Sequence, residues 1–423
     1  MQKTIGVDER PPLLKSLPLS LQHLFAMFGS TVLVPILFGV DPATILLMNG
    51  IGTLLYLILC KGQIPAYLGS SFAFLSPVFV VLSGGNYEMA LGGFIVTGVI
   101  FSLVALIIRM AGTGWIHVVF PPAAMGAIVA LIGLELVPVA AKLAGFIPDA
   151  GESETWSPDP KAVTVSLITL GVAVLGTVVF RGFLKIIPIL VSIFVGYFAA
   201  WRLGLVEFTK VIEANVLDMP TFYTPQWDLA SILIIVPASL VVIAEHVGHL
   251  IVTGNIVGKD LTKEPGLDRS LLGNGLSTIL SGFVGSTPNT TYGENIGVLA
   301  LTRVYSVWVI GGAAVIAVVL SFFGKISAVI MTIPDPVMGG VSLLLFGVIA
   351  ASGIRMLVEA KVDYAKPTNI ILTTVVLVIG ISGTTFSWGS FELKGMALAT
   401  VVAIVLSLLL RLLTAFKLTN DNE

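Results

Sequence analysis

The sequence predicts an all-α protein that crosses a membrane many times, and its composition, apolar runs and internal repeat support this. Of 423 residues, 56% are hydrophobic and 11% are charged, and the mean hydropathy is +1.02. Soluble globular domains carry about 25% charged residues. The composition therefore excludes a soluble protein and predicts a polytopic membrane protein.

Apolar runs of the length that crosses a bilayer as a helix, about 17–25 residues, can be marked at fourteen places, which predicts fourteen spans. These runs lie near 18–39, 42–60, 66–82, 89–110, 115–138, 162–180, 183–202, 229–252, 270–284, 286–302, 304–324, 335–354, 368–386 and 393–415. The third and the tenth are interrupted by Gly, Ser and Pro. Interrupted segments at corresponding places in two halves indicate a transporter binding site.

Two short motifs recur about half a chain apart. Pro-x-x-x-Met-Gly at residues 121–126 returns at 334–339, and Gly-Ser-Ser at 69–71 has a relative, Gly-Ser-Thr, at 285–287. The similar offsets predict a duplication of seven spans. Because seven is odd, the second copy must be inverted in the membrane, which gives a 7+7 inverted repeat.

The distribution of positive charge predicts the orientation. With fourteen spans, sixteen of the 22 Lys and Arg residues, Arg355 among them, fall on the side of both termini, and six fall on the other. By the positive-inside rule both termini are cytoplasmic. Residues 1–17 and 416–423 are expected to be short tails. The net charge of −2 gives no basic patch for nucleic acid, and the single cysteine, Cys60, excludes an intramolecular disulfide.

The stretch from 285 to 303, GSTPNTTYGENIGVLALTR, is polar where a membrane span is expected. Pro288 and Gly293 break the helix, and non-helical backbone survives at membrane depth only when it is buried in protein or lines a cavity. Glu294 lies in its middle, and an ionisable residue inside a membrane is by default a candidate for function. The alternative is an ordinary loop between two helices.

Few ionisable residues fall well inside the apolar runs: His23, Glu135, Glu245, His246, His249 and Glu294. Glu245 and His249 are four apart in a helical run and project from one face, whereas His246 points about 100° away. A carboxylate and an imidazole within reach of each other can share a proton, which favours a proton-linked site over a purely structural link between helices. His23 and Glu135 are read mainly as structural, with His23 bracing the polar stretch.

The order Glu245-His246-x-x-His249 differs from the zinc protease motif, in which two histidines four apart share a helix face. No cysteine ligand lies nearby. We therefore expect no metal, no other cofactor and no enzymatic activity.

Several motifs resemble the nucleobase-ascorbate transporter family. Residues 294–303, Glu-Asn-x-Gly-x-x-x-x-Thr-Arg, match its signature, and Gln22-His23 match its motif in the first span. The segments SLQHLFAMFGSTVLVP, IPAYLGSSFAFLSP, VVIAEHVGHL and GSTPNTTYGENIGV are similar to the bacterial uracil permease branch, and the resemblance covers nearly the whole chain.

The resemblance implies a division into two domains. A core domain comprises 18–112 and 229–325, and a gate domain comprises 113–228 and 326–415. It also implies short extended segments in spans 3 and 10 that pair antiparallel beside the substrate, movement of core against gate, and a homodimer formed through the gate.

The resemblance also implies the site residues. Glu245 and Glu294 bind uracil, helped by the main chain at Phe72 and Gly293. His249 and His23 join Glu245 in proton coupling or its polar network, and Tyr292, Asn295 and Phe346 lie next to the site. Phe346 departs from the tyrosine of close relatives, so a hydroxyl contact is missing.

The function implied is uracil:proton symport into the cell across the inner membrane, with uracil, H⁺ and membrane lipid as partners. A xanthine-type purine permease of the same family is the first alternative. A channel or anion exchanger of related fold is the second, although an anion site favours a cation or a helix N-terminus aimed at the substrate. Sodium as the coupling ion stays open on the residues alone.

Overall fold

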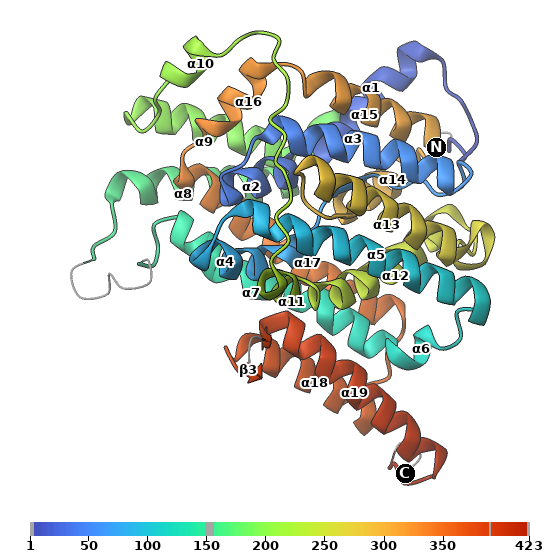
Figure 1. Cartoon of the computed structure of the whole chain (residues 1–423). Helices are drawn as coiled ribbons and strands as arrows, with labels where there is room; N and C mark the ends of the chain where they lie inside the picture. Colours follow the sequence, from blue (N-terminus) through green and yellow to red (C-terminus); the bar gives the residue numbers. More distant parts are fainter. Residues whose placement is uncertain (1–3, 149–155, 389–390, 421–423) are drawn as a thin grey trace.

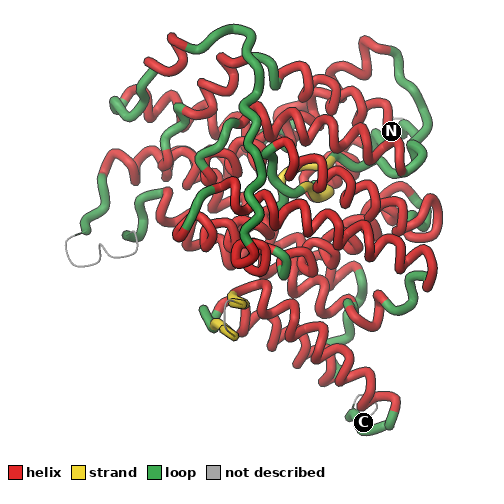
Figure 2. Tube along the Cα trace, in the orientation of Figure 1, coloured by secondary structure: helices red, strands yellow, loops and turns green. Residues whose placement is uncertain are grey.

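A computed structural model describes residues 4–148, 156–388 and 391–420, and most of these form helices (Figures 1 and 2). The first half contains α1 (Leu13–Ala26), α2 (Phe28–Phe38), α3 (Pro42–Leu59), β1 (Leu68–Ser70), η1 (Phe72–Phe74), α4 (Leu75–Gly84), α5 (Tyr87–Ala111), α6 (Ile116–Val119), α7 (Pro122–Leu143), α8 (Pro160–Val179), η2 (Gly182–Ile186), α9 (Pro188–Arg202) and α10 (Thr209–Glu213). The second half contains α11 (Leu229–Ile235), α12 (Ala238–Val257), η3 (Thr262–Gly266), α13 (Leu267–Val284), β2 (Asn289–Thr291), α14 (Gly293–Thr302), α15 (Val307–Leu320), α16 (Gly324–Met331), α17 (Asp335–Glu359), α18 (Pro367–Ile381), β3 (Thr385–Trp388), β4 (Phe391–Lys394) and α19 (Gly395–Ala415).

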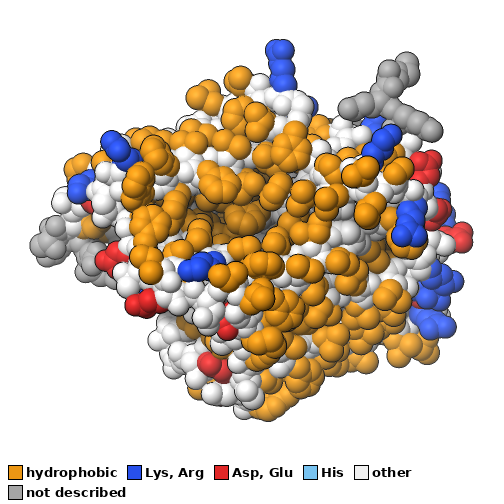
Figure 3. Space-filling view, turned by 90° about the horizontal axis from the view of Figure 1, so that it is seen from above, with side chains coloured by type: hydrophobic (Ala, Val, Ile, Leu, Met, Phe, Trp, Pro, Cys, Tyr) orange, Lys and Arg blue, Asp and Glu red, His pale blue; other side chains and the backbone are white. Residues whose placement is uncertain are grey.

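Most long helices run across the molecule in the view of Figure 1. Within the described residues, eight helices or continuous helix pairs are long and apolar enough to cross a membrane, or nine if the bent pair α15 and α16 counts as one span. In Figure 3, apolar side chains spread over the face, while charged ones gather mainly toward the left and right margins. An apolar band between two charged margins is typical of a multi-pass membrane protein.

The two halves make matching contacts. By their order in the two halves, α3 corresponds to α13 and α5 corresponds to α15. Helix α3 packs against α15, and in the same way α13 packs against α5. In the same way α8 packs on α9 and on α17, while α18 packs on α19 and on α7. The contacts between α7 and α17 and between β1 and β2 join each element to its own counterpart. A chain folded as two copies related by a two-fold axis produces this pattern.

Helices α7 and α17 cross closely at glycines. A Cβ atom on Gly126 would meet the Gly353 carbonyl near the end of α17, and a Cβ on Gly339 would meet the backbone of Ala144 at the end of α7. The start of each helix therefore packs against the end of the other, so the pair is antiparallel. The repeated Pro-x-x-x-Met-Gly motif marks the starts of these two helices.

The second repeated motif does not mark equivalent positions. Gly69 lies within strand β1, whereas Gly285 ends α13 in a left-handed conformation at φ 100° and precedes strand β2. The strands themselves, Leu68–Ser70 and Asn289–Thr291, are the corresponding elements. The offset of 216 between the glycines was therefore a coincidence of two short polar sequences.

The two strands pair antiparallel in the interior, with Leu68 opposite Thr291, Gly69 opposite Thr290 and Ser70 opposite Asn289. Several of their other polar groups bond to neighbouring helices. The amide nitrogen of Asn289 lies within hydrogen-bonding distance of Ser277 and Ser281 of α13, and Thr53 of α3 accepts from the Leu68 N–H at 2.9 Å. Helical partners thus replace the water that a strand would otherwise need.

The amino-terminal segment is attached to the body. The Ile5 N–H donates to the Arg303 carbonyl at 3.0 Å, and the Tyr305 N–H donates to the Ile5 carbonyl at 2.9 Å. The Arg10 guanidinium lies 4.7 Å from the centre of the Trp308 ring. Residues expected to form a free tail therefore line the connection between α14 and α15, and α1 begins at Leu13.

Two further details differ from the expected runs. The run near 304–324 contains α15, and a further helix, α16, follows it at 87° where the sequence predicted only a connection. A Cβ on Gly324 at this bend would meet Asn215 and Asp218 of the long connection before α11, which covers it. Strands β3 and β4 pair as a hairpin between α18 and α19, where the runs predicted only helix ends.

Candidate functional site

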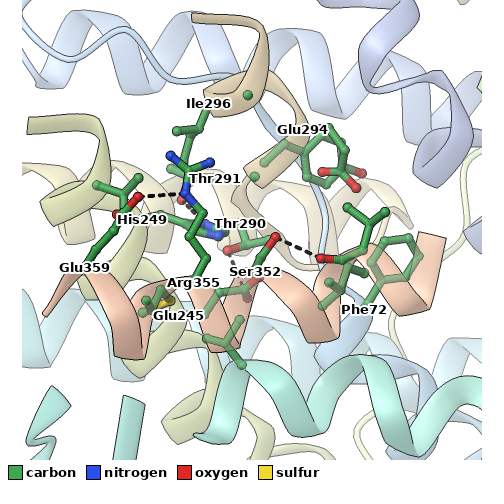
Figure 4. A pocket seen from close by; sticks show the side chains of 18 of the residues that line it. Phe72, Glu245, His249, Thr290, Thr291, Glu294, Ile296, Ser352, Arg355 and Glu359 are labelled. Atoms are coloured by element: carbon green, nitrogen blue, oxygen red, sulfur yellow. Dashed lines mark hydrogen bonds and ion pairs between the residues drawn. The ribbon is translucent and has the colours of Figure 1, made fainter. Parts of the chain in front are cut away.

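A cavity of about 240 Å³ lies where the two half-helices α4 and α14 begin, with α12 on one side and α17 on the other (Figure 4). Strand β2 forms part of its wall. The lining residues are Ser70, Phe72, Val129, Glu245, His249, Val252, Thr290, Thr291, Tyr292, Gly293, Glu294, Ile296, Gly297, Val348, Ile349, Ser352, Arg355, Met356 and Glu359.

Both strands lead directly into helical turns whose first residues, Phe72, Gly293 and Glu294, line the cavity. Ser71 precedes Phe72, and Tyr292 precedes Gly293 and Glu294; neither cap residue gives a side-chain hydrogen bond to the turn that follows. The first N–H groups of a helix have no partner within the helix, and they carry its positive dipole end. The chain therefore offers backbone donors from two directions.

Carboxylate and hydroxyl groups stand beside these donors. Thr290 Oγ1 donates to Glu245 Oε2 over 3.4 Å, and Nδ1 of His249 lies 3.1 Å from Oγ1 of Thr291. The side chains of Glu245 and His249 share one face of α12, one helical turn apart, as their spacing predicted. Both hydrogen bonds join α12 to strand β2, so the position of the carboxylate is linked to the strand pair.

The mixture of groups defines what the cavity can hold. Glu245 and Glu294 accept hydrogen bonds when ionised, whereas the N–H groups only donate. Phe72, Val129 and Ile349 supply apolar walls. A small, flat and polar molecule with both N–H and C=O groups on its edge satisfies such a set, and an analogue that leaves one buried group unpaired is rejected.

Of the residues singled out from the sequence, six line the cavity: Phe72, Glu245, His249, Tyr292, Gly293 and Glu294. Phe346 is fully buried behind it and meets Phe72 edge to face, with ring centres 5.7 Å apart. Its ring supports Phe72 from α17.

Asn295 and His23 form a brace between α14 and α1. The Asn295 amide donates to the His23 carbonyl at 3.0 Å, and its nitrogen lies 3.2 Å from the His23 ring nitrogen Nδ1. Both side chains are buried. They are not among the cavity-lining residues, so their contribution is to hold the half-helix that carries Glu294.

His246 and Glu135 lie away from the cavity. His246 Nε2 lies 2.8 Å from Ser270 Oγ, which in turn lies 2.6 Å from the Tyr56 hydroxyl, so this histidine links α12 to α13 and α3. Glu135 of α7 accepts a hydrogen bond from the Met396 N–H at 2.7 Å, at the start of α19. The two histidines of the Glu-His-x-x-His sequence thus face different partners.

Six polar lining residues were not expected as site residues from the sequence: Ser70, Thr290, Thr291, Ser352, Arg355 and Glu359. Helix α17 continues to Glu359, beyond the expected end at residue 354, so its last turns lie against the cavity. Arg355 Nε and Glu359 Oε1 lie 2.6 Å apart. Arg355 had been counted among the charges of a cytoplasmic connection, and the helical spacing of 352, 355 and 359 was the signal that could have found this face.

Inverted copies that meet at two broken helices, with a polar cavity at the break, define a membrane transporter. The family comparison agrees. The permease family model matches residues 14–389, and the chain belongs to this family, which confirms the resemblance to the nucleobase-ascorbate transporters.

The chain is similar to curated relatives over almost its full length. It is 69% identical to a uracil permease of Paenibacillus larvae subsp. larvae, covering 99% of both chains. It is 63% identical to the uracil permease of Escherichia coli K12, covering 98% of this chain and 96% of that one. The transmembrane domain of a cyanobacterial bicarbonate transporter, BicA, has the same fold with a TM-score of 0.62 at 14% identity, covering 98% of this chain and all of that one.

Proposed function

We propose that this protein takes up uracil together with protons. The proposal that uracil is the substrate rests on the identity of 69% and 63% to two uracil permeases over nearly the whole chain. The cavity supports it, because the edge of uracil alternates ring N–H donors with carbonyl acceptors. Carboxylates that accept and helix N-termini that donate match this alternation.

In the proposed complex Glu245 and Glu294 accept from the ring N–H groups, and the main-chain N–H groups of Phe72 and Gly293 donate to the carbonyls. The Phe72 ring offers a face against which the uracil ring can lie. Glu245, with His249 as its neighbour on α12, takes the coupling proton. Protonation makes the pocket less negative before the loaded site moves across the membrane, where a buried charge is costly.

The proposed architecture is fourteen spans with both termini in the cytoplasm, in the inner membrane of a bacterial cell. Residues 18–112 and 229–325 form the core that carries the site, and 113–228 and 326–415 form the gate against which it moves. The matching contacts of the two halves support this division. We further propose a homodimer through the gate, surrounded by lipid.

The test is uptake of labelled uracil into proteoliposomes. With an inward proton gradient we expect accumulation, which is lost when the gradient is removed and persists in excess unlabelled xanthine. Inhibition by xanthine would favour the purine permease, and accumulation driven by sodium would overturn proton coupling.

The proton assignment has its own test. Glu245→Gln should abolish accumulation against a gradient while saturating uracil still moves downhill, because the amide cannot carry the proton. Full gradient-driven accumulation by this variant would show that Glu245 is not the coupling residue.

A further inference from the structure

A single arginine stands at the mouth of the carboxylate-containing cavity. Ser352, Arg355 and Glu359 follow one another along the face of α17 that meets the cavity (Figure 4). Glu245 and Glu294 line the same cavity from α12 and α14. Glu245 and Glu294 therefore belong to α12 and α14, whereas the cation Arg355 and its partner Glu359 belong to α17 on the opposite side.

Arg355 lies at the open end of this cavity. The side chains of Arg355 and Glu359 are 59% and 31% exposed, and their ion pair spans 2.6 Å along one helical turn. Glu245 and Glu294 lie deeper and are partly buried. In Figure 4 the arginine extends from α17 toward Thr291 and His249, on the wall opposite its own helix.

A second cavity of about 160 Å³ continues beyond the ion pair. It shares Val252, Met356 and Glu359 with the first, and it adds His117 and Asn255. Val252 and Asn255 follow Glu245 along α12, and Glu359 follows Arg355 along α17, so this cavity lies toward the carboxyl ends of both helices. The charge distribution places those ends on the cytoplasmic side, so a solute that leaves toward the cytoplasm passes Arg355.

One step of the proposed transport cycle requires a cation at this position. After uracil and the proton have left, the empty site must return across the membrane with its carboxylates ionised. Ionised carboxylates in a closed, water-poor cavity repel each other and lose their hydration, which is unfavourable unless a cation is near. Among the residues described as lining the cavity, one carries a Lys or Arg side chain, and it is Arg355.

We infer that Arg355 serves as the counter-charge for the empty site during its return. Glu359 holds the guanidinium at the mouth while the cavity is open to the cytoplasm. When the two sets of helices close on the empty cavity, Arg355 leaves Glu359 and approaches the carboxylates of Glu245 and Glu294. Arg355 is thus a positioning residue for one half of the cycle. This inference rests on the proposed uracil:proton symport.

The prediction separates two transport modes. Exchange of labelled for unlabelled uracil moves only loaded sites, whereas net uptake and net efflux require the empty site to return. We expect Arg355→Gln to slow net flux in both directions by about tenfold, a barrier change of about 1.4 kcal/mol, and to leave exchange within about twofold of wild type. Arg355→Lys should recover part of the net flux, because it keeps the charge but not the planar fork of donors.

Two other variants sharpen the test. Glu359→Gln frees the arginine from its partner, so net flux should stay at the wild-type rate or rise, opposite to Arg355→Gln. Lys361→Gln, which removes an exposed cation just beyond the end of α17, is the matched control and should change neither mode. Adding Glu245→Gln to Arg355→Gln should restore downhill net flux at saturating uracil, because the returning site then carries less negative charge.

Equal losses of exchange and net flux in Arg355→Gln, unchanged net flux, or the same defect in Glu359→Gln would each overturn the inference. Thermal stabilisation of each purified variant by uracil shows that the variant is folded and binds uracil. If Arg355→Gln does not fold, the fluxes of Arg355→Lys serve as the test instead. Wild-type liposomes that neither exchange nor accumulate uracil would overturn the proposed function, and the inference with it. Wild-type liposomes that do both, with variants that fail the pattern, would overturn the inference alone.

Discussion

Nδ1 of His249 lies 3.1 Å from Oγ1 of Thr291, and this contact joins the middle of α12 to strand β2. Both side chains are buried, and Thr291 pairs with Leu68 in the other strand. The face of α12 that carries Glu245 is therefore tied to the paired strands from which both half-helices begin. We expect substrate affinity to depend on this link even though Thr291 is not a charged residue.

Thr291→Val keeps the size of the side chain and removes the hydroxyl, which leaves a ring nitrogen of His249 without its partner. An unpaired buried polar group costs about 1–3 kcal/mol. We expect uracil binding to weaken by about tenfold, as measured by titration calorimetry in detergent. Thr177→Val is the control, because the Thr177 hydroxyl bonds only to the Ala173 carbonyl of its own helix in the described contacts. Unchanged affinity in Thr291→Val would show that the link does not position Glu245.

Asn295→Ala removes the brace between α14 and α1. Two contacts to His23 are lost in a buried place, so the folded protein should lose about 1–3 kcal/mol of stability. Thermal unfolding in detergent measures this loss. Asn369→Ala removes an amide near the start of α18 that donates to the carbonyl of Asp363 in the exposed connection before it, and this variant should unfold close to the wild-type temperature. Equal shifts in the two variants would contradict the proposed brace.

Gly353→Ala places a methyl group against the backbone of Ala130 in α7. The two helices must move apart, and overpacking of this kind typically costs about 1–3 kcal/mol. Gly347→Ala on the same helix has open space and is the matched control. We expect lower thermal stability and slower uracil uptake only in the first variant. A stable Gly353→Ala protein with normal uptake would show that the close crossing of α7 and α17 is not required.

Ile5→Pro removes the N–H that donates to the Arg303 carbonyl. The amino-terminal segment should detach from the connection between α14 and α15, because proline cannot donate a backbone hydrogen bond. Limited proteolysis of residues 4–12 should become faster, with Ile5→Ala as the control that keeps the backbone bond. Equal protection of both variants would mean that side-chain contacts, and not the backbone pairing, hold the segment.

The sequence was sufficient for a largely helical, multi-pass fold and for six residues that line the cavity, because each depends on strong local signals. Glycines and Pro288 mark the broken span, and the spacing of four residues between Glu245 and His249 predicts that they share one face of a helix. Arg355 was missed because counting charges along the chain cannot distinguish the last turn of a helix from the connection after it. The pairing of Ile5 with Val304 was also missed, since it uses backbone groups that every residue has.

The strands Leu68–Ser70 and Asn289–Thr291 are three residues long and, within the part of the chain that the structure describes, have only each other as strand partners. A polypeptide that held a single copy of the repeat would have one unpaired strand and one half-helix within the bilayer. It could complete the site only by joining a second molecule inserted in the opposite orientation. An ancestor of this fold with one copy would therefore have needed dual topology, and gene fusion would then have freed each half to specialise, leaving Glu245 and Glu294 in one half and Phe72 in the other.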